Sequence, residues 1–147
     1  MTGGDIRRFL ETCSKLGTTP SHWPYRNLFD FILKNGKEFV TMANPDIEMG
    51  KKGECFMNAF KLAEFDDVYT YVEGYAYSVG IPMLHAWTVT KYGIVVDPTW
   101  SNGTAYYGVT FPLDYVREIM LRRGAYGVLD CWEIKWPLLT GDDEYPI

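Results

Sequence analysis

The sequence predicts an α+β domain in which a cysteine-bearing helix packs on an antiparallel sheet. Up to residue 64, apolar side chains recur at spacings of three and four, which is typical of amphipathic helices. From residue 68 the apolar period becomes two, which is typical of strands with one buried face. Short connections with glycine or proline separate these strands, so we expect an antiparallel meander behind the helix.

Two N-terminal helices are predicted within residues 5–34. The first covers 5–16, where the apolar stripe includes Cys13, and the second covers 25–34. The loop between them contains two prolines and His22, and we expect this histidine at the surface.

A third helix and three strands form the central part of the chain. The helix covers 54–64 and places Cys55 in its first turn, on the side that packs. Strands are predicted at 68–78, 84–90 and 94–97, with tight turns between them.

The remaining segments carry weaker patterns. Residues 39–42 are ambiguous, 103–110 form a loop or a short strand, and 113–123 form a helix. Residues 126–132 are compatible with one more strand. The acidic end, 141–147, is expected to be frayed.

The composition narrows the class of protein. A chain of 147 residues with 47% apolar side chains is expected to fold as one domain with one core, which argues against disorder. Lys and Arg total 14 against 19 Asp and Glu, a net charge of −5 without a basic stripe, so nucleic-acid binding is disfavoured. No apolar run approaches the ~18 residues of a membrane span, and no secretory signal opens the chain.

The three cysteines point to a reducing compartment. An odd and sparse count in a chain without a signal argues against a disulfide scaffold. We therefore expect a cytoplasmic protein, although a virion-packaged or injected protein would look the same. The oligomeric state stays open. We expect Cys13 and Cys131 to serve packing, because cysteine is among the most buried residue types.

Three residues in order carry a pattern for nucleophilic catalysis. Cys55 begins a helix, His85 lies within a strand, and Asp97 ends the next strand. A thiol nucleophile needs a base to take its proton and a third group to orient that base. The helix N-terminus favours the thiolate. With a turn near Tyr92, we expect His85 and Asp97 to be cross-strand partners joined by an Nδ1–H to carboxylate bond.

The segments around these residues resemble a known group. They read Tyr-Val-Glu-Gly-Tyr-Ala at 71–76, Leu-His-Ala-Trp-Thr-Val at 84–89 and Val-Val-Asp-Pro-Thr-Trp at 95–100. This order resembles the transglutaminase-like superfamily, a circularly permuted relative of the papain-like cysteine peptidases. The resemblance covers residues 53–100, about a third of the chain. It implies a papain-like core with Cys55, His85 and Asp97 at the positions of the catalytic triad.

The resemblance implies a cysteine-dependent hydrolase or acyltransferase of the peptidase, amidase or deamidase type. Such an enzyme acts on a peptide or side-chain amide through a thioester on Cys55, with a protein or peptide as substrate and without a cofactor. Two alternatives stay open: a catalytically inactive binding module with the same fold, and an acyl-CoA-dependent arylamine acyltransferase, for which the chain is short. A Cys55 pKa well below that of free cysteine favours the enzyme, and an ordinary value favours the binding module.

The sequence departs from the family pattern next to the nucleophile. Phe56 stands where many members have tryptophan, and no clear glutamine precedes Cys55 to stabilise an oxyanion. Glu54 cannot replace it when ionised, because a carboxylate only accepts hydrogen bonds. The backbone N–H of Cys55, together with a group from the 44–53 loop or the Trp23 loop, is the expected oxyanion donor.

Four further residues are candidates for substrate binding. Trp87 and Trp100 either wall the cleft or cap the core. Asn58 lies one turn after the nucleophile and offers a polar group. Glu73 lies on a tyrosine-rich strand face, as an edge residue or as part of the cleft. The scattered histidines and cysteines do not make a metal site, and no glycine-rich phosphate loop follows a strand.

Overall fold

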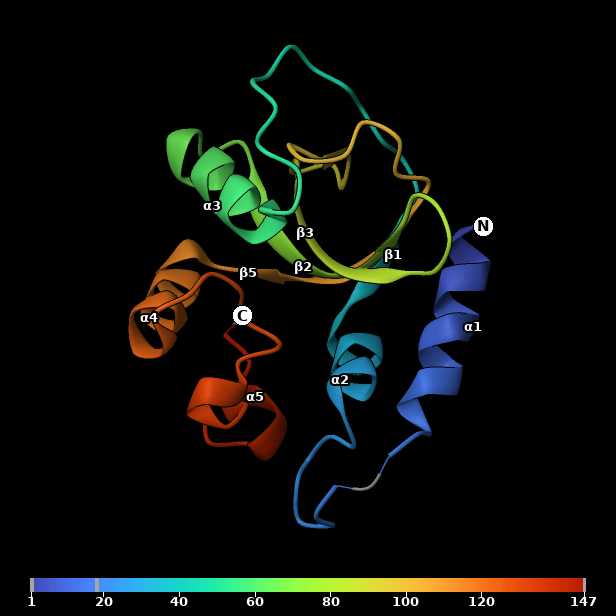
Figure 1. Cartoon of the computed structure of the whole chain (residues 1–147), viewed down its shortest axis with the longest axis vertical. Helices are drawn as coiled ribbons and strands as arrows, with labels where there is room; N and C mark the ends of the chain where they lie inside the picture. The colour runs from blue at the N-terminus through green and yellow to red at the C-terminus, as the bar shows by residue number, and fades with distance from the viewer. Residues whose placement is uncertain (1, 18, 147) are drawn as a thin grey trace.

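The computed structural model describes residues 2–17 and 19–146 and shows an α+β fold around a curled antiparallel sheet (Figure 1). The five strands are ordered β1-β5-β2-β3-β4. Their bounds are β1 (Lys37–Phe39), β2 (Thr70–Tyr77), β3 (Met83–Val89), β4 (Val95–Val96) and β5 (Ala105–Phe111).

The helices flank this sheet. They are α1 (Gly3–Ser14), α2 (Leu28–Asn35), α3 (Cys55–Phe65), α4 (Leu113–Arg123) and α5 (Pro137–Thr140), with a short 3-10 turn, η1, at Trp132–Ile134. Figure 1 shows α1, α2 and α5 on one side of the sheet and the 40–54 segment on the other. Among the described helices, none is long and apolar enough to cross a membrane.

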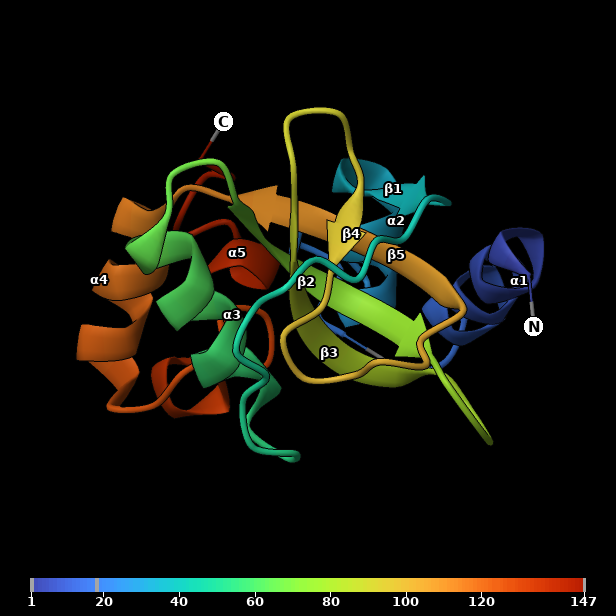
Figure 2. The same cartoon turned by 90° about the horizontal axis from the view of Figure 1, so that it is seen from above.

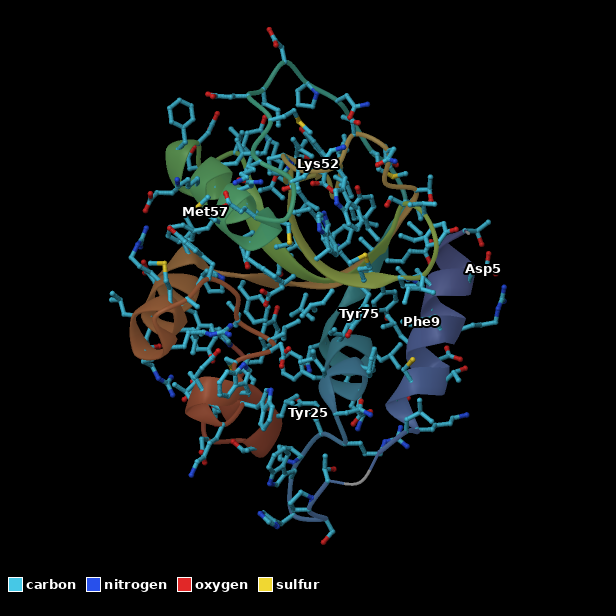
Figure 3. All side chains as sticks on the ribbon, viewed as in Figure 1. Asp5, Phe9, Tyr25, Lys52, Met57 and Tyr75 are labelled. Carbon is cyan, nitrogen blue, oxygen red and sulfur yellow. The ribbon has the colours of Figure 1, made fainter. Side chains whose placement is uncertain are left out.

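The period of two along the strands builds two apolar layers. Tyr71 and Val109 join the larger cluster, which includes side chains from the helices, and Phe9 of α1 meets Tyr75 with ring centroids 6.0 Å apart (Figure 3). Trp87 belongs to a smaller cluster on the opposite face. Its other buried members are Phe39, Val72, Ala76, Val89, Val95 and Tyr106. The predicted alternation of faces is therefore confirmed in β2.

Most of the predicted elements are present. The α4 bounds coincide with the predicted helix, and the β2-β3-β4 meander forms in the expected order. The ambiguous 39–42 segment contributes the end of β1 and a bridge from Met42 to Val95. The 103–110 segment is a full strand, β5, which lies between β1 and β2.

Two expectations near the C-terminus are wrong. Residues 126–132 do not form a strand, because the N–H groups of Val128 and Leu129 bind the Glu73 carboxylate instead of a neighbouring strand. The acidic end is not frayed over 141–146: Asp143 accepts hydrogen bonds from Tyr115 at 2.9 Å and from Arg122 at 2.8 Å. Residue 147 lies outside the described residues.

The ring of Trp87 on β3 requires a glycine on β5, two strands away in the sheet. Trp87 is 0% exposed, and a Cβ added at Gly108 would lie 2.7 Å from its Cη2 atom. Gly108→Ala is therefore expected to lower the free energy of unfolding by about 3 kcal/mol, measured by urea denaturation. Gly4→Ala is the control, because its Cβ meets only Thr2 Oγ1 at 4.0 Å. Equal free energies of unfolding for the two variants would contradict this predicted clash with Trp87.

Candidate active site

The candidate site lies where β3, the end of β4 and the N-terminus of α3 meet. β4 pairs with β3 only through Val95 and Val96, so the chain leaves the sheet at Asp97. The edge of β3 at Ala86 is therefore not covered by β4, and α3 lies beside this part of the sheet (Figure 2). As a result, the Cys55 thiol comes within reach of the backbone N–H of Ala86.

A buried hydrogen bond joins His85 and Asp97. Nε2 of His85 lies 2.8 Å from Oδ2 of Asp97, and the two residues are only 1% and 8% exposed. The ring of Trp100 stacks on the imidazole, with centroids 3.7 Å apart and planes inclined by 14°. Carboxylate and indole together hold the ring in one orientation and shield the hydrogen bond from water.

The pairing differs from the expected one in two respects. The register is displaced by two residues, because Val96 lies opposite Thr88 rather than Ala86. An even displacement keeps each side chain on its face, so His85 and Asp97 still meet although they are not cross-strand partners. The carboxylate binds Nε2 rather than Nδ1, and Nδ1 has no hydrogen-bond partner among the described residues.

Asp97 is held by donors on both carboxylate oxygens. The Tyr106 hydroxyl donates to Oδ2 at 2.8 Å, and the N–H groups of Thr99 and Trp100 donate to Oδ1 at 2.9 and 3.0 Å. These bonds compensate for burying the charge. Gly103 makes room for the Tyr106 hydroxyl, because a Cβ at this position would collide with it. Sequence reasoning missed Tyr106, since nothing local distinguishes it among 11 tyrosines.

Asn58 joins α3 to the segment that follows Asp97. Its Nδ2 donates to the Lys51 carbonyl and to Thr99 Oγ1, both at 2.9 Å. Gly50 packs directly against this amide and leaves no room for a Cβ. Asn58 is buried and these bonds give it a role in holding the site together, and it also lines a groove of about 640 Å³.

The pKa of the Cys55 thiol is raised above its ordinary value. The side chain is half-buried, and burial raises its pKa to about 11; the charges of Glu73 and Asp97 act in the same direction. The N–H groups of Ala86 and Phe56 lower the pKa but are outweighed. The N–H of Phe56 in the first turn of α3 acts in the direction expected for a helix N-terminus, but burial has the larger effect on the pKa of Cys55.

The other three candidate substrate-binding residues differ in exposure: one covers His85, and two lie in the interior. Trp100 is half-buried and covers His85. Trp87 and Glu73 are both 0% exposed, so neither lies at a sheet edge or walls a cleft. Glu73 instead accepts hydrogen bonds from Tyr71 Oη at 3.1 Å and from two backbone N–H groups of the 126–129 segment.

Burial of Glu73 predicts a pH-dependent stability. Desolvation raises its pKa from 4.5 to about 7, so the folded chain binds this proton more tightly than the unfolded chain. The resulting stabilisation is complete below pH 4.5 and is lost as the pH rises through 7. Between pH 4.5 and 8, urea denaturation should show the wild type losing roughly 3 kcal/mol relative to Glu73→Gln. Parallel pH profiles for the two proteins would contradict this assignment.

Backbone groups are the available oxyanion donors. No side chain caps the N-terminus of α3, so the N–H of Cys55 is not taken by a cap. In the preceding loop, the N–H groups of Gly50 and Glu54 bind the carbonyls of Pro98 and Lys51. The Trp23 loop packs against the helix-side core, and Figure 1 places it at the end of the molecule away from α3. This loop therefore does not supply the donor in this structure.

Two grooves flank the 43–50 segment. One, of about 300 Å³, reaches Asp97, and the other, of about 640 Å³, lies against α3 and reaches Asn58. Lys52, labelled in Figure 3, lies between the 43–50 segment and α3 in the chain. Away from the site, Cys131 is buried, Cys13 is half-buried and His22 is exposed. Within residues 2–17 and 19–146, no three His, Cys, Asp or Glu side chains converge to hold a metal ion.

The fold and the site together define an α+β protein with a buried, tryptophan-covered His–Asp pair next to a helix-start cysteine. No family model, curated protein sequence or solved structure matches the chain.

Proposed function

We propose that this chain is a cysteine-dependent hydrolase or acyltransferase that acts on a peptide or side-chain amide, on a papain-like, transglutaminase-like core. The observation that carries the proposal is the buried His85–Asp97 pair beside the helix that begins with Cys55. A carboxylate that orients an imidazole near a thiol supplies the base and the orienting group that thiol catalysis needs. The cover of Trp100 over His85 keeps this pair dry.

The proposed reaction proceeds in two stages. In the first, Nδ1 of His85 takes the thiol proton as Cys55 Sγ bonds to the carbonyl carbon, and the proton passes to the leaving amine as the C–N bond breaks. In the second, water or an amine attacks the thioester, gives a proton to the imidazole and displaces the Cys55 sulfur, which takes that proton back. Asp97 accepts Nε2–H throughout and stabilises the imidazolium.

A neutral resting thiol is compatible with this mechanism. Proton transfer to His85 then coincides with attack and needs no preformed thiolate. Substrate binding is expected to bring the thiol and the imidazole together, because catalytic hydrogen bonds often tighten only in the substrate complex. In the proposed mechanism the backbone N–H of Cys55, at a helix start that no side chain caps, binds the developing oxyanion.

Trapping with hydroxylamine tests the proposal. Hydroxylamine intercepts a thioester as a hydroxamate, so the chain, incubated with a peptide mixture rich in glutamine, is expected to release peptide hydroxamates. Mass spectrometry separates products from backbone and side-chain amides, which also resolves peptidase from deamidase activity. Absence of hydroxamate across the mixture, with Cys55 shown to be intact and reduced, would count against an enzyme.

The raised pKa of Cys55 specifically favours a second candidate, a binding module that keeps the fold without catalysis. Such a module retains a peptide from the same mixture but yields no hydroxamate, and Cys55→Ala leaves its affinity unchanged. An enzyme yields hydroxamate, and its alanine variant yields none.

A further inference from the structure

The segment 126–129 is held by two groups of opposite charge, the half-buried guanidinium of Arg123 and the buried carboxylate of Glu73. The guanidinium Nη1 of Arg123 donates to the carbonyls of Tyr126 and Gly127 at 3.3 and 2.8 Å. The Glu73 carboxylate accepts from the N–H groups of Val128 and Leu129 at 2.8 and 2.7 Å. A cation thus binds two successive carbonyls, and an anion binds the next two N–H groups. Together they fix the direction and the position of this irregular backbone segment.

This segment lies directly behind the nucleophile helix. A Cβ at Gly127 would be 3.3 Å from Glu73 Oε1, 3.5 Å from Phe56 Cδ1 and 3.2 Å from Arg123 Nη1. Gly127 has φ 103°, a conformation that favours glycine, and these distances leave little room for a side chain at this position. Phe56 follows Cys55 in the chain, so the 126–129 segment lies close to the first turn of α3.

A second path joins Glu73 to the site through the sheet. Glu73 lies directly opposite Ala86 in the β2-β3 ladder, and the backbone N–H of Ala86 is the group within reach of the Cys55 thiol. The ionisable groups around Glu73 are Tyr71 on its own strand, Cys55 on α3, Arg123 on α4 and Cys131 beyond the 126–129 segment. Cys55 is therefore near a wholly buried carboxylate that the proposed reaction does not use.

We propose that Glu73 is a positioning residue for the Cys55 site: with Arg123 it fixes the 126–129 segment behind Phe56, and its carboxylate, opposite Ala86 in the β2-β3 ladder, places a buried negative charge close to the Cys55 thiol. This inference rests on the proposed function for its purpose, but its physical content concerns the thiol alone. Ionisation of Glu73 near pH 7 raises the pKa of Cys55 by charge repulsion.

The test is the rate of Cys55 alkylation by iodoacetamide between pH 5.5 and 9.5, followed by peptide mass spectrometry. In the wild type, the logarithm of the rate is expected to rise with pH but to drop to a lower parallel line as Glu73 ionises. Glu73→Gln removes the charge, so its rate should match the wild type at pH 5.5 and exceed it about threefold or more at pH 9. Hydrogen exchange at the Val128 and Leu129 amides should be faster in this variant.

Two controls separate this role from a purely structural one. Glu133→Gln cuts the outer ion pair of Arg123, at 2.8 Å, and leaves the Glu73 charge in place, so its ratio to the wild type should not vary with pH. Loss of packing alone would change alkylation by the same factor at every pH. A pH-independent ratio for Glu73→Gln, including a ratio of one, therefore overturns the proposal, even if exchange at the two amides increases.

A second variant covers the case in which Glu73→Gln does not fold. Arg123→Gln removes the cation that lowers the pKa of Glu73, so the bend in the alkylation profile should move to higher pH. A bend that stays in place belongs to another group and refutes the inference. None of these measurements requires turnover, so a chain that forms no hydroxamate can still show the coupling, and an active enzyme can still lack it.

Discussion

Cys55→Ala is expected to abolish hydroxamate formation, with a fall of at least about 10⁴-fold in the rate measured by mass spectrometry. The reason is chemical: without the sulfur no thioester forms, and water in the site has no covalent route to the amide. The side chain is half-buried at the start of α3, and alanine fits this position without a new polar group, so the fold should persist.

Cys13→Ala and Cys131→Ala are the matched controls. Cys13 is half-buried on α1 and Cys131 is 1% exposed with its thiol near the Leu129 carbonyl, so both serve packing. We expect the wild-type rate per folded molecule from each. A Cys55→Ala variant that retains more than about a tenth of the activity would falsify the nucleophile assignment.

Asp97→Asn is expected to lower the same rate by about 10³- to 10⁴-fold while the chain stays folded. The carboxylate accepts Nε2–H of His85, whereas an amide can present N–H to Nε2 and force the proton to Nδ1. Nδ1 is the nitrogen that must accept the thiol proton, so the variant keeps the shape of the site and loses its base. The tautomer can be read from the imidazole nitrogen shifts by NMR.

Asp97→Ala separates tautomer from fold. This change leaves the Tyr106 hydroxyl and the N–H groups of Thr99 and Trp100 without their acceptor, which is expected to cost about 3–5 kcal/mol in unfolding free energy. Tyr106→Phe is the matched control, because it removes one donor and keeps the carboxylate; we expect a cost of about 1 kcal/mol and a loss of activity below tenfold. An Asp97→Asn variant as active as Tyr106→Phe would remove the orienting role from Asp97.

Local patterns were sufficient for the elements whose partners are close in sequence. The 3.6 period located α3 and α4, and the period of two located the β2-β3 hairpin with its neighbour β4. Local patterns predict only a loop or short strand at 103–110, because the place of β5 between β1 and β2 depends on pairing with residues that lie far away in the sequence. Residues 126–132 resemble a strand in composition, yet a buried carboxylate takes their N–H groups.

The candidate site shows the same division. The order of Cys55, His85 and Asp97 is a property of the sequence, and a two-residue error in register did not separate the last two, since side chains alternate with a period of two. The choice of Nε2 over Nδ1 depends on how Asp97 leaves the short strand β4 and turns under Trp100. That turn is set by contacts from Tyr106 and Asn58, which lie elsewhere in the chain.

The sequence therefore established the α+β class and ranked Cys55 above the other two cysteines, because periodicity and residue order are local properties. The sequence could not predict the direction in which the pKa of that thiol is shifted. The helix start alone favours a thiolate, but burial and the carboxylates of Glu73 and Asp97 raise the pKa to about 11. The sequence predicts Glu73 as an edge residue or as part of the cleft, whereas the fold buries it against the 126–129 segment. Desolvation and long-range charge depend on which distant segments meet, and only the assembled tertiary structure defines them.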